Sequence, residues 1–200
     1  MAAIFTQTDR TTPMRSKEKI DYTKAPAYQV LDEALFCDVA FVGRDGAPRV
    51  LPTFPVRVGN TVYFHGSTGS SLGLGAAGDG LPVCLTATIV DGLVFSKSWF
   101  HHSMNYRSVV VHGEARVVTD EDERWNAMRA LIERMSLGRS ERSREPSAKE
   151  LSAVAIMVLS LEEVSVKARS GPPVEEPDDE PITHFNNGVA EVKTVITGRL

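Results

Sequence analysis

Cysteine is scarce in this sequence of 200 residues, and long apolar runs are missing. The two cysteines, Cys37 and Cys84, are too few for a disulfide framework or a four-thiolate metal site, and both lie in apolar runs that favour burial. The longest apolar run, residues 153–159, is far shorter than the roughly 18 residues of a membrane helix. Because the N-terminus also lacks the apolar segment of a secretory signal, we expect a soluble cytoplasmic protein.

A large excess of basic charge is also missing. Lys and Arg number 22 against 26 Asp and Glu, and several of these acids fall within residues 175–180. Domains that bind nucleic acid carry a basic excess, so nucleic acid is not an expected partner, and nothing points to a membrane. With 42% hydrophobic residues, the chain has enough apolar side chains for one ordinary core.

The hydrophobic pattern predicts one strand-rich domain over residues 23–168, between an N-terminal tail (1–22) and an extended acidic C-terminal tail (169–200) that packs on the domain or on a partner subunit. Short apolar segments are separated by Gly-Asn and Asp-Gly pairs that favour hairpins, including one at residues 91–92. Helical spacing follows Pro26 and again Asp120. The predicted strands are residues 37–42, 48–58, 61–65, 83–90, 93–98, 106–118 and 153–166.

Successive strands are not separated by helices of 10–15 residues, which argues against a parallel sheet. About six antiparallel strands with one apolar face close most economically into a small barrel, because closure removes exposed edges. The expected fold class is therefore mainly β (α+β), with two or three peripheral helices.

Residues 65–71, His-Gly-Ser-Thr-Gly-Ser-Ser, combine hydroxyls with a permissive backbone at the end of a predicted strand. This combination is typical of an uncharged phosphate-binding loop, although a flexible surface loop fits it equally well. A G-x-G-x-x-G pattern follows at Gly73, Gly75 and Gly78. It lies outside any βαβ unit and is interpreted as chance.

Arg49 and Arg107 each lie in an otherwise apolar strand, where an arginine needs an anion or a carboxylate. Together with the hydroxyl-rich loop they indicate a phosphate-bearing ligand. The alternative is that both project into water or pair with Glu114 or Asp45. The five histidines show no metal-ligand spacing, so no metal site is expected.

Three segments carry a family resemblance: residues 49–70, 83–118 and 167–180, of which the block at 101–115 is the most specific. They resemble the FMN-binding split-barrel family related to pyridoxamine 5′-phosphate oxidase. Within it, they are most similar to the flavin-nucleotide-binding proteins of the nitroimidazole-resistance group. The resemblance implies a six-stranded antiparallel split β-barrel that forms a homodimer, with FMN at the dimer interface.

Positions matched to the family imply how FMN is held. The first strand of the match would contact the flavin ring and ribityl chain, the hydroxyl-rich loop would take the phosphate, and residues 99–105 would form the mouth of a substrate pocket. The implied cofactor-binding residues are Arg49, Val50, Leu51, Pro52, Thr53, His65, Gly66, Ser70, Ser71, Arg107 and Ser108.

Two departures weaken the case for pyridoxamine phosphate oxidation itself. Ser70 and Ser71 stand where the oxidases have basic residues, and the oxidases' substrate-binding arginine and histidine near the C-terminus are not recognisable. The resemblance instead favours an FMN-dependent oxidoreductase acting on a small organic molecule, for example a nitro-aromatic, with NAD(P)H as a candidate electron donor. His65 is the best candidate for acid–base catalysis because histidine titrates near neutral pH.

Two alternatives stay open from the sequence. One is a flavin-binding or sensing protein that turns over no substrate. The other is a split barrel that holds haem or a deazaflavin in place of FMN, with His101, His102 or His112 as the axial ligand of a haem.

Overall fold

A computed structural model describes residues 2–15 and 17–197, and within these ranges the chain is mainly antiparallel β-sheet with four α-helices. The strands are β1 (Ile20–Asp21), β2 (Cys37–Val42), β3 (Pro48–Thr53), β4 (Val56–Val58), β5 (Thr61–Ser67), β6 (Leu81–Phe95), β7 (Ser103–Val117), β8 (Val154–Ser160), β9 (Glu163–Arg169) and β10 (Gly188–Glu191). The helices are α1 (Lys24–Glu33), α2 (Ser71–Ala76), α3 (Glu121–Met135) and α4 (Ala148–Ala153), with short 3₁₀ turns η1 (Lys17–Lys19), η2 (Trp99–His101), η3 (Ser140–Arg142) and η4 (Pro177–Asp179).

The sheet follows the path β3-β2-β6-β7-β8-β5-β4, with β9 paired to β7 and β1, and β10 paired to β6. Its two ends approach each other where the Thr53 hydroxyl of β3 donates a hydrogen bond to the His65 carbonyl of β5, at 3.3 Å. No backbone ladder joins β3 to β5 in the described residues, so the sheet curls without closing. The expected antiparallel α+β class is confirmed, whereas the sheet contains ten strands rather than six.

A β-bulge replaces the hairpin that the Asp91-Gly92 pair predicts. The two segments predicted on either side of it form one strand, β6, which pairs with β7 along its length with a register shift between Val90 and Gly92. A Cβ on Gly92 would lie 2.9 Å from the Val189 side chain of β10. The glycine therefore permits close approach of β10 at the bulge, and β6 continues through the bulge as one strand.

Two other predicted strands are each divided in the structure. Residues 48–58 form β3 and β4, which are separated at Phe54-Pro55, and proline at that point supplies no N–H for a continuous ladder. Residues 153–166 form β8 and β9, separated by a bend at Leu161 and Glu162; both pair with β7, and β8 also pairs with β5.

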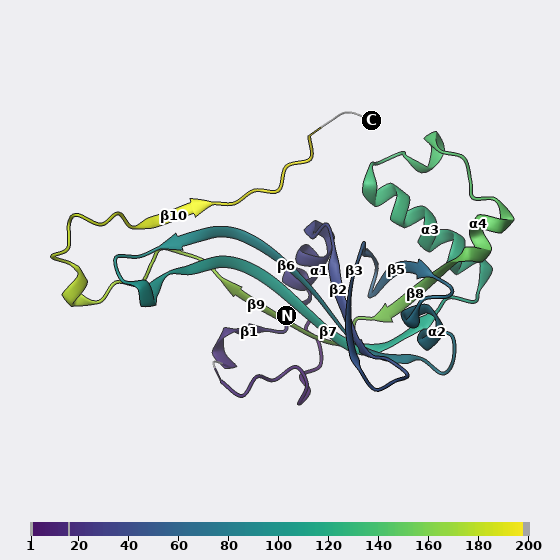
Figure 1. Cartoon of the computed structure of the whole chain (residues 1–200), viewed down its shortest axis with the longest axis horizontal. Helices are drawn as coiled ribbons and strands as arrows, with labels where there is room; N and C mark the ends of the chain where they lie inside the picture. The colour runs from purple at the N-terminus through teal and green to yellow at the C-terminus, as the bar shows by residue number, and fades with distance from the viewer. Residues whose placement is uncertain (1, 16, 198–200) are drawn as a thin grey trace.

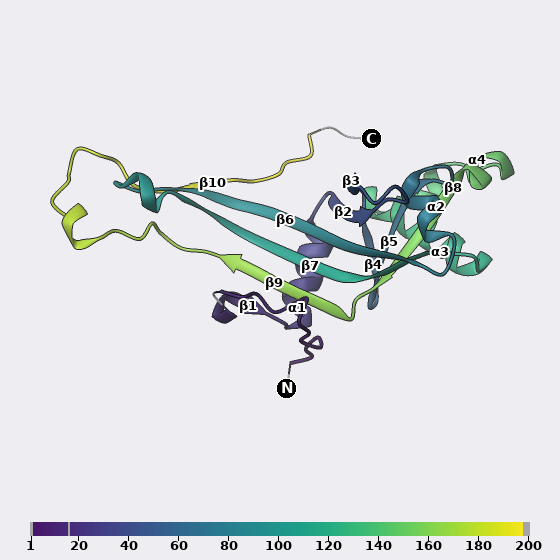
Figure 2. The same ribbon diagram turned by 60° about the horizontal axis from the view of Figure 1, so that its bottom comes forward.

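The β6–β7 hairpin projects beyond the barrel as a long arm with η2 at its tip (Figures 1 and 2). Strand β10 pairs with the outer part of β6, with Gly188 opposite Phe95 and Glu191 opposite Gly92. Thus the C-terminal segment lies along the arm. None of the helices in the described residues is long and apolar enough to cross a membrane.

The N-terminal segment is fixed to the barrel through specific contacts. Phe5 is 4% exposed and packs edge-to-face on Tyr28 of α1, with the ring centroids 6.0 Å apart. Thr8 and Arg10 both donate hydrogen bonds to the carboxylate of Glu163, at the start of β9. These contacts order a region whose sequence shows little periodicity.

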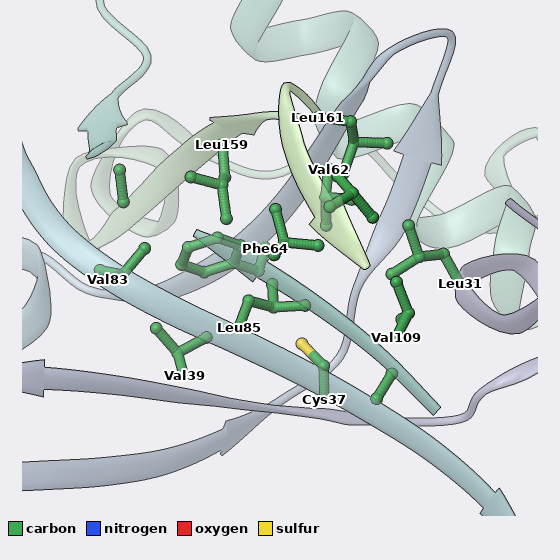
Figure 3. Close-up of a cluster of buried hydrophobic side chains, with 14 of the residues drawn as sticks. Leu31, Cys37, Val39, Val62, Phe64, Val83, Leu85, Val109, Leu159 and Leu161 are labelled. Atoms are coloured by element: carbon green, nitrogen blue, oxygen red, sulfur yellow. The ribbon is translucent and has the colours of Figure 1, made fainter. Parts of the chain in front are cut away.

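The main core lies between α1 and the inner faces of the strands (Figure 3). Phe64 of β5 is fully buried at its centre, among leucine and valine side chains. Cys37 is also fully buried, and burial raises the pKa of its thiol to about 12. This cysteine therefore acts as a small hydrophobic side chain, as its sequence context indicates.

We predict that Phe64→Ala lowers the free energy of unfolding by about 3–5 kcal/mol, because it leaves a cavity in a filled core. Leu137→Ala is the matched control, since Leu137 is 88% exposed in the loop after α3. Urea denaturation followed by circular dichroism measures both. Equal losses of stability in the two variants would contradict the assignment of the core.

Candidate functional site

The turn between β5 and α2 holds the hydroxyl-rich residues in a fixed arrangement. The Ser70 hydroxyl accepts a hydrogen bond from the Gly73 N–H at 3.0 Å and donates to the Ser67 carbonyl at 2.8 Å. The Thr68 N–H donates to the Ala153 carbonyl at 3.1 Å, which ties the turn to the start of β8. Because these bonds hold it on both sides, the turn is ordered, and we call residues 66–73 the cradle.

Two glycines keep this cradle compact. A Cβ on Gly73 would lie 2.5 Å from the Ser67 carbonyl oxygen, so only glycine allows α2 to begin this close to the strand. A Cβ on Gly66 would lie 3.3 Å from the terminal methyl of Met157. On the open side of the cradle, Ser71 is exposed to solvent.

Strand β3 forms an accessible edge of the sheet. It pairs with β2, and no other strand of the described residues pairs with its free edge. Val50 is 61% exposed and Leu51 38% exposed, and Pro48 and Pro52 supply no N–H. An edge with exposed apolar side chains and free carbonyls can contact a flat ligand, whereas the prolines discourage pairing with another strand.

Strand register divides the predicted cofactor residues between two faces of the sheet. Leu51 lies opposite the buried Val39, so Leu51, together with Arg49 and Thr53 at alternate positions, projects on the barrel side. Pro52 lies opposite Asp38 on the other face. That outer face also carries Val50, Thr86, Thr88 and Ser108.

Arg49 is paired with a carboxylate of its own hairpin. Its guanidinium donates two hydrogen bonds to the Asp45 carboxylate, both at 2.8 Å, and it lowers the pKa of Asp45 to about 2. This pairing is one of the alternatives that the sequence leaves open. A phosphate contact by Arg49 would require it to leave Asp45.

Arg44, which the sequence analysis did not single out, reaches the cradle from the same hairpin. Its guanidinium donates to the Leu74 carbonyl of α2 at 3.2 Å, and its side chain is otherwise exposed. Leu74 lies one helical turn after Ser71, a rise of about 5 Å. This arginine is a cation at the edge of the cradle, and because the contact spans 30 residues no local motif indicates it.

Arg107 lies in a different part of the sheet and is held there by two carboxylates. It donates to Asp91 at 2.9 and 2.8 Å and to Glu33 of α1 at 2.6 Å. This guanidinium lowers the pKa of Asp91. Three ladders separate β7 from β3, a distance of about 14 Å across the sheet. The structure therefore does not bring Arg107 together with Arg49.

Ser108 faces away from Arg107 because neighbouring residues of a strand alternate between faces. Its hydroxyl lies 2.9 Å from the Thr88 hydroxyl on β6. The two hydroxyls make this part of the outer face polar. Val50 and Pro52 of β3 project on the same face.

The histidines are dispersed. His65 is exposed on β5 beside the cradle, and His112 lies on β7 in a partly buried place where burial lowers its pKa. His101 and His102 belong to the arm tip, where His101 lies 3.3 Å from Glu176. Within residues 2–15 and 17–197, no three His, Cys, Asp or Glu side chains gather closely enough to hold a metal ion.

The cradle and β3 form an open surface. Three cavities, of about 770, 420 and 200 Å³, lie elsewhere, and none is lined by residues of β3 or of the cradle. Arg107 lines the second of them, between α1 and β9. The exposed side chains of Val50 and Ser71 show that this surface is accessible to a ligand.

A family model described as pyridoxamine 5′-phosphate oxidase matches residues 23–168, which include the cradle, β3 and the arm. The chain belongs to this family. The match covers most of the chain, and no curated protein sequence matches it. The family resemblance drawn from the sequence is confirmed.

Among solved structures, the chain is 31% identical to the flavocytochrome Anf3 from Azotobacter vinelandii, with a TM-score of 0.87 over 96% of this chain and 88% of that one. It is also 31% identical to an FAD and haem binding protein from Mycobacterium smegmatis, with a TM-score of 0.82 over 91% of this chain and 88% of the other. A putative 5-nitroimidazole antibiotic resistance protein from Bacteroides thetaiotaomicron is 17% identical, with a TM-score of 0.62 over 74% of this chain and 85% of that one, and shares the fold.

We predict that Arg107→Met lowers the free energy of unfolding near neutral pH by about 1 kcal/mol, because it leaves Asp91 and Glu33 without their common cation. Since the pKa of Asp91 is lowered below 3.8 in the folded protein, this contribution is present above that value and is lost as the pH falls through the folded pKa. The difference between wild type and variant should therefore shrink in acid, as urea denaturation across pH would measure.

The same variant tests whether Arg107 contacts a flavin. Its dissociation constant for FMN should equal that of the wild type, with Lys193→Met, at an exposed ion pair, as the control. If Arg107→Met raises the dissociation constant for FMN more than about tenfold, Arg107 contributes to FMN binding.

Proposed function

We propose that this protein is a flavin-dependent redox protein that binds FMN on the open surface formed by β3 and the cradle, and that it acts as a homodimer on a small organic molecule. The proposal rests on membership of the pyridoxamine 5′-phosphate oxidase family together with this surface. When bound, a flavin supplies electron-transfer chemistry that amino-acid side chains lack.

The donor set fits a flavin mononucleotide. Leu51, which projects on the same face as Thr53, offers an exposed apolar side chain to a flat ring, and the free edge of β3 offers backbone groups to the polar rim of that ring. The exposed hydroxyl of Ser71 suits the phosphate, and Arg44 supplies the positive charge that serine at positions 70 and 71 does not. The N–H groups of Thr68, Gly69, Ser70 and Gly73 already donate hydrogen bonds within the protein.

His65 is the titratable side chain beside this surface. It is exposed on β5, one residue from the cradle glycine Gly66, and its backbone carbonyl already holds Thr53. In this place it can exchange a proton with a substrate that lies over the ring. No other histidine of the described residues belongs to β3, β5 or the cradle.

A second copy of the chain is proposed to cover the open side of the ligand. Trp99 and Phe100 at the arm tip are 96% and 87% exposed, and monomeric proteins seldom leave large aromatics projecting on an extended arm. The arm points away from its own barrel (Figure 2). The outer face of β3, β6 and β7 is equally uncovered at Val50 and Thr88.

We predict that Arg44→Ala raises the dissociation constant for FMN about tenfold, because it removes a charge-assisted hydrogen bond worth about 1.5 kcal/mol. Fluorescence titration with FMN measures it. Arg49→Ala is the matched control from the same hairpin and should change affinity less, since Asp45 already holds that side chain. The reverse order would assign the phosphate to Arg49.

Catalysis is tested separately from binding. Oxidation of NAD(P)H coupled to reduction of a nitro-aromatic compound by the FMN-loaded protein would establish an oxidoreductase. Saturable FMN binding without turnover over a panel of acceptors would instead leave a flavin carrier or sensor.

A second candidate function is electron transfer between a flavin and a haem. It is favoured by 31% identity to two proteins described as a flavocytochrome and as an FAD and haem binding protein, over nearly the whole chain. His65, His101, His102 and His112 are then the possible axial ligands.

The absorption spectrum after addition of haemin distinguishes the two candidates. A Soret band that persists through gel filtration, and that His65→Ala, His101→Ala, His102→Ala or His112→Ala removes, would support the flavocytochrome function. FMN or FAD binding with no stable Soret band would support the flavin-only protein.

A further inference from the structure

A cleft of about 770 Å³ lies between α3 and the loop that leads to α4. Both helices and their connecting loop are at the end of the molecule opposite the arm (Figure 1). The residues that line the cleft belong to α3, η3, α4 and the loop between them, and none belongs to β3, β5 or the cradle. The cleft is therefore separate from the surface proposed for the flavin.

The floor of the cleft is an apolar stripe of α3, of which Met128 also packs against the barrel core. Ala127 and Leu131 are buried against the barrel and anchor the helix there. Trp125, Met128 and Ile132 recur at spacings of three and four residues on an adjacent face and are only partly buried. This second stripe faces the connecting loop.

Polar contacts hold the loop away from this stripe. The Glu133 carboxylate accepts hydrogen bonds from the N–H groups of Gly138 and Ser140, at 2.5 and 2.8 Å. Farther along, Arg144 donates two hydrogen bonds to Glu150, at 2.8 and 2.7 Å, and the same carboxylate accepts the Ser147 N–H. Because the loop is fixed at both ends by these bonds, it arches over the apolar side chains instead of packing onto them.

We propose that this cleft binds a small, uncharged, mainly aromatic molecule whose apolar body packs on Trp125 and Ile132. Its volume is within the range of about 300–1,000 Å³ that small-molecule sites occupy. Arg129 and Glu141 line the rim with opposite charges, Arg144 and Glu150 neutralise each other, and Glu145 adds one further carboxylate. The lining therefore disfavours an anion, and the apolar floor favours an uncharged body over a charged one. This site goes beyond the proposed flavin function.

Tryptophan fluorescence tests the proposal directly. The chain has two tryptophans, so Trp99→Phe leaves Trp125 as the only one. The neutral dye N-phenyl-1-naphthylamine absorbs where tryptophan emits. We expect energy transfer from Trp125 to the bound dye. As dye is added, the fluorescence of Trp125 should fall and that of the dye should rise to saturation, with a dissociation constant on the order of micromolar.

Two substitutions in the Trp99→Phe background block the cleft in different ways. Ile132→Glu places a carboxylate on the apolar floor, and Ser143→Phe fills the cleft from the loop. Each should raise the dye's dissociation constant at least about tenfold. Leu137→Glu is the matched control, because Leu137 is 88% exposed and does not line the cleft, and it should leave the dissociation constant unchanged.

Four results would overturn the proposal. The first is the absence of saturable energy transfer, and the second is transfer that survives both Ile132→Glu and Ser143→Phe. The third is displacement of the dye by FMN, which would assign the dye to the flavin surface. Concentration-dependent shielding of Trp125 without dye would also count against it, since a second copy of the chain would then cover the cleft.

Discussion

The antiparallel ladder between β6 and β7 is the interaction on which the rest of the structure depends. Inside the barrel, β6 pairs with β2 and β7 pairs with β8 and β9, so the ladder connects both sides of the core. Outside it, the same strands form the arm and receive β10. The bulge at Gly92 makes this continuity possible, because it admits β10 without ending the strand. The barrel and the arm are therefore formed by the same two long strands, β6 and β7.

Local patterns predict the elements well and their connections less well. The hydrophobic spacing of α3 and the apolar strand at 37–42 depend on neighbouring residues, and both elements are found. The Asp91-Gly92 pair predicts a turn from local propensity alone. The structure overrides that preference, because Arg107 holds Asp91 from the partner strand and β10 packs against Gly92. Such contacts join residues far apart in the sequence, where no periodicity reveals them.

In the candidate site, too, local features are predictable from the sequence and contacts between distant residues are not. The cradle is a local feature: Ser70 caps α2 and Gly73 allows a close approach to Ser67, so residues near one another in the sequence fix the turn. The partners of Arg107 and Arg44 lie far from them in the sequence. Arg107 pairs with carboxylates of α1 and β6, and Arg44 donates a hydrogen bond to a carbonyl of α2. A strand pattern indicates that an arginine needs a counter-charge but not which one it meets. Only the folded sheet places Arg107 and β3 apart.

We propose that one chain offers half of a flavin site and that a second copy of the chain completes it. Sedimentation velocity of the FMN-loaded protein, followed at the visible absorption band of the flavin, tests this claim most directly. The account predicts that flavin absorbance sediments with a particle of twice the chain mass. Flavin that sediments with a single chain, or that stays free while the protein moves, would contradict it.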